Sequence, residues 1–544
     1  MSVKSQLTLP LVILSMSTLL ISFAASAAVP VPAVQTRSRN DPAWKSHPYG
    51  GTLVWGSVFP PTAFNPTRNY TGITTALQDL IFNRLVRLNA DGEMEPDLAR
   101  SWDISDDGRV YTFHLREGVR FHDGVELTAE DIRFTYERIL DEAHESPYRP
   151  DLIPVERLEC PDRYTFRVVF KTPDPLWLRR MVREVLPKHL LSGDSDQAAA
   201  FYDRPVGTGP FRFDFWDKEK RTLGLKANTD YFEGRPYLDA VRVRIYPDNS
   251  TLWAAFMRRE VDLVQFINRE DFMVAAEDAS FRTYAVEWGM YSALLFNTED
   301  PIWHNPQLRR AVAHAIDTRQ FRETFDVQDG RSPAIPASER TIRPYPFDPS
   351  RAAAILDEEG WRMGGSGIRQ KDGEELELRI LIDERSRMDR IAARIIRQNL
   401  AEVGVRAKVL LYSDEKELTM PLWQERRPQA WVRLVPDPDF LGVLALEFWY
   451  SYSHNRGKIW KYRNQRADML FERIEKEKSA AKIAMLTQEM CGSIYEDQPA
   501  SYLFLPKSLF AVSARFANTS AYFTNSQPTF TIKDWYITPT NTQP

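Results

Sequence analysis

The sequence predicts an α/β fold built from more than one domain. The clearest unit is LELRILID (376–383), then a helix carrying Ile395, Ile396 and Leu400 on one face, then VRAKVLL (405–411). Strand, helix and strand with short connections form a βαβ unit, so this block should hold a parallel strand pair. At 544 residues the chain is also too long for one ordinary core, and roughly 150 residues per domain gives three or four domains.

The first elements along the chain are a strand and an amphipathic helix. TLVWGSVF (52–59) has the composition of a strand and runs into the turn PPTAFNP. The helix should follow this turn, because apolar residues recur there at helical spacing. Its predicted apolar face comprises Ile73, Leu77, Leu80, Ile81 and Leu85.

The next block pairs alternating strands with a capped helix. VYTFHL (110–115) and YTFRVVF (164–170) alternate apolar and polar residues, as half-buried strands do. Between them, the helix 128–140 opens with Thr128 and Asp131, which have the spacing of a capping box. After this block, the turn-rich VGTGPF (206–211) introduces further strands, and a third block starts near YSALLFN (291–297).

The N-terminus has the pattern of a secretory signal peptide. Lys4 precedes an apolar stretch over 7–24, and small residues at 24–28 predict cleavage near residue 27 or 28. A retained membrane anchor is the alternative. The small residues that follow the apolar stretch favour cleavage. A lipoprotein anchor is not expected, because no cysteine follows the cleavage site.

Metal, catalytic and nucleic-acid sites are not predicted. The eight histidines are scattered, and Cys160 and Cys491, with no neighbouring histidine, cannot form a zinc site. We expect both cysteines to be thiols and leave a disulfide between them open. Asp437 and Asp439 lie between prolines that hold the backbone extended, so their side chains should diverge rather than act as an acid–base pair. No basic run is dense enough to bind a phosphate backbone.

Several segments, in order, resemble one family. They are 98–140 (LARSWDISDDGRVYTFHLREGVRFHDGVELTAEDIRFTYERIL), PVGTGPFRF (205–213), LLFNTEDPIWHNPQLRRAVAHAID (294–317), YPFDPSRAAAILDEEGW (345–361), RIIRQNLAEVGVRAKV (394–409) and DWY (534–536). Together these resemble the family 5 extracellular solute-binding proteins, the peptide, dipeptide and nickel receptors of ABC importers. The resemblance covers nearly all of the chain that follows the signal.

The resemblance implies an α/β type II periplasmic-binding-protein-like fold, with two hinged lobes and an extra domain inserted in the first lobe. The implied division is signal peptide 1–28, first lobe 29–85, 206–290 and 508–544, extra domain 86–205, and ligand-closing lobe 291–507. The ligand would bind in the cleft between the lobes and favour the closed form.

The stretch AWVRLVPDPDF (430–440) resembles the family segment that, in peptide receptors, carries an aspartate for the ligand's α-amino group. Trp431 and Pro436-Asp437-Pro438 fix the alignment, which places Leu434 at the aspartate position. Leu434 cannot pair with a buried ammonium, and Arg433 beside it adds a positive charge. We therefore expect a blocked, modified or cell-wall peptide, an opine-like solute or an anion, while a free-amino-terminus peptide remains the alternative.

The other predicted ligand-binding residues come from segments that line the family's cleft. They are Trp431, Arg433, Phe59, Asn65, Tyr291, Ser453, His454 and Tyr502. Core packing is the competing role for each of them.

The implied function is that of a periplasmic, monomeric, soluble receptor that captures a peptide or peptide-like solute and delivers it to an inner-membrane ABC permease. It would perform no catalysis and carry no cofactor or metal. A periplasmic hydrolase of peptides or cell-wall fragments, and a ligand-sensing module of a signalling system, are the alternatives.

Overall fold

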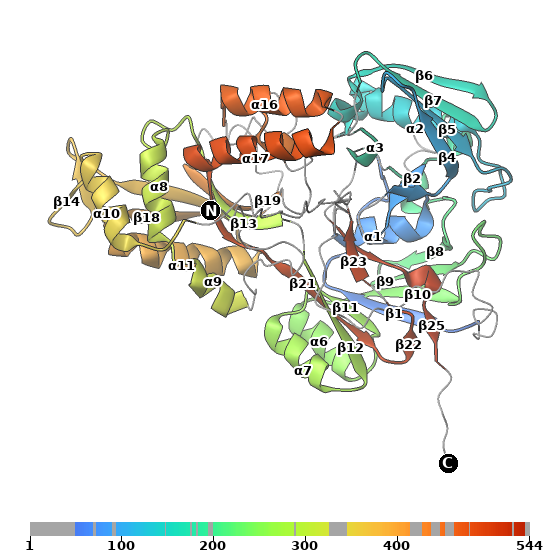
Figure 1. Ribbon diagram of the computed structural model, residues 1–544. Coiled ribbons are helices and arrows are strands. Elements are labelled where there is room, and N and C mark those ends of the chain that lie inside the picture. The colour runs from blue at the N-terminus through green and yellow to red at the C-terminus, as the bar shows by residue number, and fades with distance from the viewer. Residues whose placement is uncertain are drawn as a thin grey trace, which may run out of the picture.

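Two large sheets and one smaller sheet organise the protein (Figure 1). The computed structural model describes residues 49–68, 72–89, 94–146, 148–173, 177–180, 183–193, 200–287, 290–325, 345–413, 427–436, 446–451, 462–477, 479–519, 521–524 and 527–538. Each large sheet has helices packed on both faces, which makes each one the centre of an α/β lobe.

The first lobe is built on a seven-stranded sheet. In spatial order its strands are β12 (Phe281–Glu287), β21 (Lys507–Ser513), β11 (Leu263–Gln265), β1 (Thr52–Ser57), β10 (Ala240–Ile245), β9 (Thr222–Ala227) and β8 (Phe211–Asp217). One face packs on α1 (Gly72–Ile81) and α4 (Lys188–Leu191), and the other on α6 (Asn249–Met257) and α7 (Arg269–Glu277).

The second lobe is built on a five-stranded sheet. Its strands, in spatial order, are β18 (Arg406–Tyr412), β17 (Glu377–Asp383), β19 (Ala430–Pro436), β13 (Met290–Phe296) and β20 (Ala500–Phe504). One face is covered by α8 (Pro306–Ala315), α9 (Thr318–Phe325), α10 (Pro349–Glu358) and α11 (Arg387–Glu402). The other face is covered by α16 (Gln465–Lys476) and α17 (Ala480–Asp497).

A four-stranded antiparallel sheet forms the core of the third unit. Its order is β4 (Ala99–Ile104), β5 (Val110–Leu115), β7 (Thr165–Phe170) and β6 (Val155–Asp162), with α2 (Ala129–Leu140) and α3 (Trp177–Arg180) packed on one face. Small sheets complete the structure: β2 (Val86–Leu88) with β3 (Met94–Pro96); β14 (Arg362–Met363), β15 (Arg369–Lys371) and β16 (Glu374–Glu375); β22 (Phe516–Ala517) with β25 (Tyr536–Ile537); β23 (Ala521–Thr524) with β24 (Gln527–Phe530).

Two strong sequence signals are confirmed. Strands β17 and β18 are parallel neighbours joined by α11, as the βαβ pattern predicts. Helix α2 carries the predicted capping box: Thr128 and Asp131 satisfy each other's backbone N–H groups, and Thr128 N donates to Asp131 Oδ2 at 2.8 Å.

The predicted helical face that ended at Leu85 is wrong at its last position. Helix α1 ends at Ile81, and Leu85 belongs to the core of the four-stranded sheet. The helix stops because the glycine turn at 207–209 packs on its last carbonyl: Gly209 N donates to Ile81 O at 2.8 Å. A Cβ on Gly207 would lie 2.0 Å from that oxygen.

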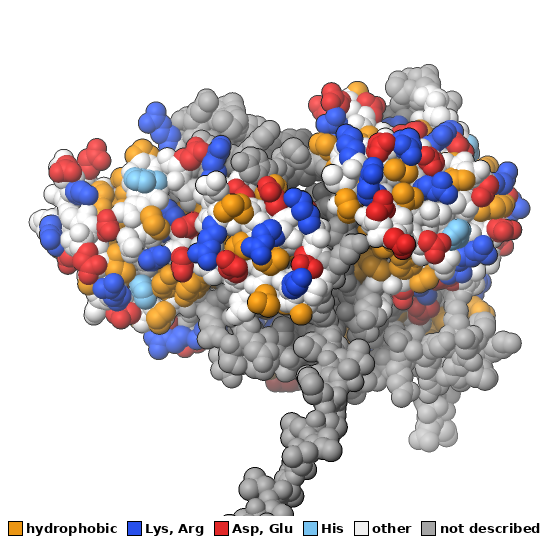
Figure 2. Space-filling model, turned by 45° about the horizontal axis from the view of Figure 1, so that its top comes forward, with side chains coloured by type: hydrophobic (Ala, Val, Ile, Leu, Met, Phe, Trp, Pro, Cys, Tyr) orange, Lys and Arg blue, Asp and Glu red, His pale blue; other side chains and the backbone are white. Residues whose placement is uncertain are grey.

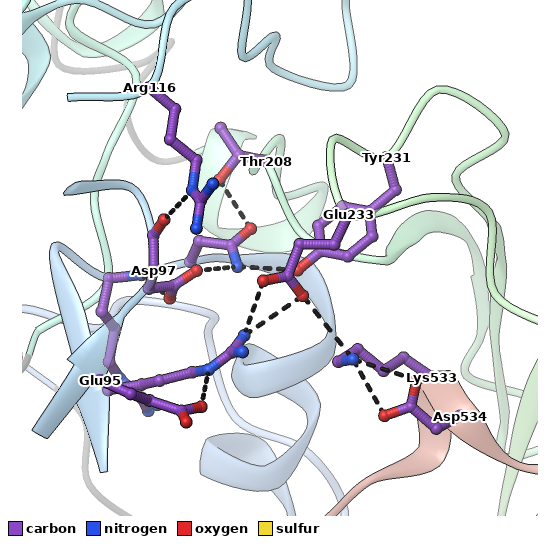
Figure 3. Close-up of polar contacts among 11 residues, drawn as sticks. Glu95, Asp97, Arg116, Thr208, Tyr231, Glu233, Lys533 and Asp534 are labelled. Atoms are coloured by element: carbon purple, nitrogen blue, oxygen red, sulfur yellow. Dashed lines mark hydrogen bonds and ion pairs between the residues drawn. The ribbon is translucent and has the colours of Figure 1, made fainter. Parts of the chain in front are cut away.

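A buried polar network fixes the β2–β3 hairpin to the first lobe (Figure 3). Asn83 Nδ2 donates to Asp97 Oδ1 at 2.8 Å and to Tyr231 Oη at 3.1 Å. Glu233 forms ion pairs with Arg87 at 3.3 Å and Lys533 at 3.6 Å. Burial raises the pKa of Asp97, and the charge of Arg87 opposes that rise. Because this network spans several separate segments, the hairpin and the first lobe should move together.

The surface visible in Figure 2 mixes basic and acidic side chains, with hydrophobic ones scattered between them. Cys160 and Cys491 are both thiols and lie in separate hydrophobic clusters, so the disulfide left open by the sequence is not formed. Within the described ranges, no helix is both long enough and apolar enough to cross a bilayer.

Candidate functional site

The ends of parallel strands define an interlobe edge in each lobe. In the second lobe β17 and β19 run parallel, so Asp383 and Pro436 end at the same edge of the sheet. In the first lobe β1 runs parallel to both β10 and β11, which brings Ser57 and Gln265 to one edge. In open α/β sheets, ligands bind outside the carboxyl ends of such strands.

Helices α7 and α11 place these two edges opposite each other. Each helix begins directly after a parallel strand, β11 or β17, and therefore at the interlobe edge of its own lobe. Burial raises the pKa of Asp271 in the first turn of α7, and the positive charge of Arg387 in α11 acts against that rise. A charge in the second lobe thus reaches a carboxylate in the first.

The chain crosses between the lobes from β12 into β13 and from β20 back into β21. These crossings are short, because β12 ends at Glu287 and β13 begins at Met290, while β20 ends at Phe504 and β21 begins at Lys507. Two short connections beside the facing edges are the arrangement that a hinge requires.

Strand β19 presents its side chains to opposite faces of the second lobe's sheet. Trp431 packs in the cluster beneath α16 and α17, and the Arg433 guanidinium lies 4.2 Å from the centre of its ring. Ala430 and Val432 pack toward α11 instead. By strand alternation Leu434 faces the α11 side, opposite Arg433. Leu434 is half-buried and pairs with Ser292 of β13.

Asp389 is a carboxylate on that same α11 side. It lies in the first turn of α11, three and four residues before Ala392 and Ala393, which face the sheet. Burial raises the pKa of Asp389 to about 6, while the Ser386 hydroxyl and the charge of Arg433 oppose the rise. Arg433 is therefore close enough to act on Asp389 although the two lie on different faces of the sheet.

Phe59 and Phe266 lie at the interlobe edge of the first lobe. Phe59 follows β1 and is 58% exposed. Phe266 follows the neighbouring strand β11 and has a φ of 55°, a left-handed conformation that is strained for a bulky residue. Its ring lies 6.1 Å from that of Phe510. Strained residues of this kind concentrate at ligand sites.

The remaining predicted site residues lie mostly within packed structure. Tyr291 and Tyr502 are buried against each other, with ring centres 5.4 Å apart. Asn65 is buried and accepts hydrogen bonds from Thr67 N and Oγ1 through its side-chain oxygen. Ser453 and His454 lie outside the described residues, as do Asp437 and Asp439. Ligand contact by these residues, and by Trp431, Arg433 and Leu434, stays a prediction.

Sequence reasoning missed Asp389 and Phe266. Their positions in the sequence could have indicated them. Asp389 lies shortly after the predicted strand β17, and Phe266 follows the short strand β11, and both strands end at the interlobe edge. A small cavity beside β20, lined by Tyr345, Gln498, Ser501 and Tyr502 among others, has a volume of only about 10 Å³. It has room for about one water molecule and not for a solute. Among the described residues, no cluster of His, Cys, Asp and Glu has a metal-binding arrangement.

Comparison with known proteins gives the same architecture. Residues 93–441, more than half of the chain, match the family described as bacterial extracellular solute-binding proteins, family 5 Middle. The oligopeptide-binding protein AppA of Bacillus subtilis is 25% identical over 92% of this chain and 95% of its own length. Heme-binding protein A of Haemophilus influenzae is 30% identical over 58% of this chain and 62% of its own.

Solved structures share the fold at low identity. AppA from Bacillus subtilis, in complex with a nonapeptide, superimposes with a TM-score of 0.78 at 23% identity, covering 91% of this chain and all of AppA. NikZ from Campylobacter jejuni, in complex with Ni(L-His), gives 0.75 at 21% identity, covering 89% of this chain and 99% of NikZ. The fold is thus that of the periplasmic binding proteins, as expected, and the chain belongs to family 5 of the bacterial extracellular solute-binding proteins.

Proposed function

We propose that this protein captures a peptide or peptide-like solute between its two lobes and delivers it to an inner-membrane ABC permease. The observation that carries the proposal is the pair of facing interlobe edges joined by two short crossings. A solute held by both edges would favour the closed arrangement, and closure by binding needs no chemical step. The names of relatives that bind peptides support the solute class.

The division of the chain is part of the proposal. Strand β12 belongs to the first lobe's sheet and β13 to the second, and the chain returns with β21. This supports hinge positions near 290 and 507, with 291–507 as the lobe that moves. Three apolar residues from the proposed extra domain 86–205, namely Leu186, Leu191 and Phe201, pack in the first lobe's core. That packing supports an extra domain carried rigidly by the first lobe.

The recognition of the solute is proposed to differ from that of a receptor with an aspartate on β19. Leu434 provides no carboxylate at that position, so a blocked or modified peptide or an opine-like solute suits this strand better than a simple peptide amine. The Arg433 guanidinium stacks on Trp431 on this strand, and its positive charge would favour a carboxylate of the solute.

We also propose export to the periplasm as a monomer, with cleavage near residue 27 or 28. The mature protein would begin at about Ala28 or Val29. Sequencing the N-terminus of the exported protein and measuring its mass in solution test this part. An intact Met1 in a membrane pellet, or a stable dimer, would contradict it.

The test of function begins with the solute that co-purifies with the protein. Mass spectrometry should identify a peptide or peptide-like compound, and calorimetry should show that the same compound rebinds saturably and is recovered intact. Recovery of cleaved products would instead support a hydrolase. Failure of any peptide-like compound to bind would overturn the proposed solute class.

A further inference from the structure

We propose that Asp389 binds a cationic group of the solute. It lies in the first turn of α11, at the interlobe edge of the second lobe. The inference rests on the proposed capture of a peptide-like solute. It differs from the preference inferred from β19 alone, because the amine partner absent from β19 would be supplied by α11 and a free amine would be bound in preference to a blocked one. No resemblance assigns a role to this residue, and the argument comes from where its carboxylate lies and what it lacks.

The side chain is directed toward the sheet. Residues 389, 392, 393 and 396 follow the spacing of one helical face. Ala392, Ala393 and Ile396 of this face pack in the cluster between α11 and the sheet. Asp389 continues that face by one turn toward the interlobe edge, where β17 and β19 end. The carboxylate therefore lies at the mouth of the space between helix and sheet.

Hydrogen bonds at the helix terminus hold the carboxylate but do not neutralise its charge. In a capping box the acid at this position receives the backbone N–H of the N-cap residue. Asp131 of α2 does so, with Thr128 N at 2.8 Å. In α11 the corresponding Ser386 N donates to Asp383 O at 3.1 Å, and Ser386 Oγ accepts from Asp389 N at 3.1 Å. The helix is capped by the serine. The aspartate carboxylate accepts from the Ser386 hydroxyl and from the backbone N–H of Asp383, and neither of these donors carries a charge.

The carboxylate also lacks a counter-ion in the part of the chain that is described. No Lys, Arg or His there lies within ion-pair distance of Asp389, whereas neighbouring Asp383 pairs with Arg385 at 2.8 Å. The positive charge that acts on its pKa, Arg433, is directed to the opposite face of the sheet and stacks on Trp431. A half-buried carboxylate without a close cation is less stable in its ionised form, and an ammonium or guanidinium from the solute would compensate its charge.

The groups that face Asp389 set its expected pH behaviour. They are Asp383 at the end of β17, the Ser386 hydroxyl and the charge of Arg433 from β19. Burial raises the pKa of Asp389 to about 6, so the carboxylate becomes fully charged only above that pH. Binding of a cation through Asp389 should strengthen as the pH rises from about 5 to 7.5.

The test uses two probes that differ in one charge, trialanine and N-acetyl-trialanine, measured by calorimetry on the mature protein. Wild type should prefer trialanine. Asp389→Asn should weaken trialanine binding by roughly ten- to a hundredfold, the range of a charge-assisted hydrogen bond, and change N-acetyl-trialanine binding less than twofold. The variant should also lose the rise in trialanine affinity between pH 5 and 7.5. Asp389→Glu should retain part of the preference.

Asp131→Asn is the matched control, since it removes an acid at the same helical position in a helix away from the interlobe edge. It should lower stability and leave the ratio of the two affinities unchanged. An Asp389→Asn protein that keeps both the preference and its pH dependence would overturn the role of Asp389. So would a wild type that binds both probes equally, although peptide capture would then stand. If neither probe binds to wild type, the role of Asp389 is overturned, whereas the proposed capture of a peptide-like solute is decided by rebinding of the co-purifying compound.

Discussion

Leu434 and Asp389 lie on the same side of the second lobe's sheet, at the ends of β19 and β17–α11 respectively. A carboxylate introduced on the strand should therefore replace one removed from the helix. We predict that Leu434→Asp in the Asp389→Asn background restores most of the affinity for trialanine, about 1.5–3 kcal/mol. Calorimetry on the single and double variants measures the rescue. A double variant no better than Asp389→Asn would show that the two positions do not face the same group.

Arg309 illustrates a buried charge with a structural role. The residue is 3% exposed, and among the described residues its side chain donates only to backbone carbonyls, including Trp303 O at 2.6 Å and Gln498 O at 2.9 Å. Burial lowers its pKa to about 10. These bonds tie the C-terminal end of α17 to α8.

We predict that Arg309→Met lowers the free energy of unfolding by about 3–5 kcal/mol, because several buried carbonyls lose their donor. Denaturant unfolding measures the loss. Arg310→Ala, which removes a half-buried side chain bonded to Glu496 O, should cost less than about 1 kcal/mol. Equal losses for the two variants would contradict this account.

At the scale of elements, the glycine turn at 207–209 sets where α1 ends and joins the extra domain to the first lobe. We predict that Gly207→Ala lowers the free energy of unfolding by at least about 2 kcal/mol. The new Cβ would lie 2.0 Å from Ile81 O, and a backbone atom cannot shift without disturbing the helix. Gly365→Ala, where nothing lies within 4 Å, is the control and should change the free energy of unfolding by less than about 0.5 kcal/mol. Similar effects at both glycines would refute the packing argument.

His122 holds the same turn from the extra domain. Its Nδ1 accepts from Gly207 N at 3.2 Å and its Nε2 donates to Gly209 O at 3.0 Å, which requires the neutral ring. Burial lowers the pKa of His122 to about 4, with the charge of Arg212 adding to the effect. The stabilisation is thus complete above about pH 6.5 and is lost as the pH falls through about 4.

Between pH 7 and pH 4 the free energy of unfolding of wild type should fall. We predict that this fall is about 2 kcal/mol smaller in His122→Phe. Denaturant unfolding at several pH values measures the two slopes. Parallel profiles for wild type and variant would mean that His122 does not couple this turn to pH.

Elements with local signals were predictable, and those fixed by distant contacts were not. The capping box of α2 and the βαβ unit around α11 are determined by residues that are close together in the sequence. Leu85 continued the spacing of α1, yet the helix ends earlier because a turn more than a hundred residues away meets Ile81. From the sequence alone, Asp389 cannot be distinguished from any other acidic residue in the first turn of a helix. Its missing counter-ion is a property of three-dimensional neighbours. The family alignment pointed to Leu434, and the structure adds the carboxylate of Asp389 on the same side of the sheet.

At the scale of the whole molecule, two lobes with separate sheets and cores are joined by two short crossings. Such a construction resists deformation inside each lobe and permits rotation between them. The network around Asp97 and Glu233 binds the β2–β3 hairpin to the first lobe, so the extra domain should travel with that lobe.

The central claim is that a solute draws the second lobe onto the first, and small-angle scattering with and without solute tests it most directly. The solute is the compound that co-purifies, removed by partial unfolding and added back to saturation. The account predicts a smaller radius of gyration with solute, explained by rotation of residues 291–507 as a rigid body. An unchanged radius of gyration at saturation would contradict it.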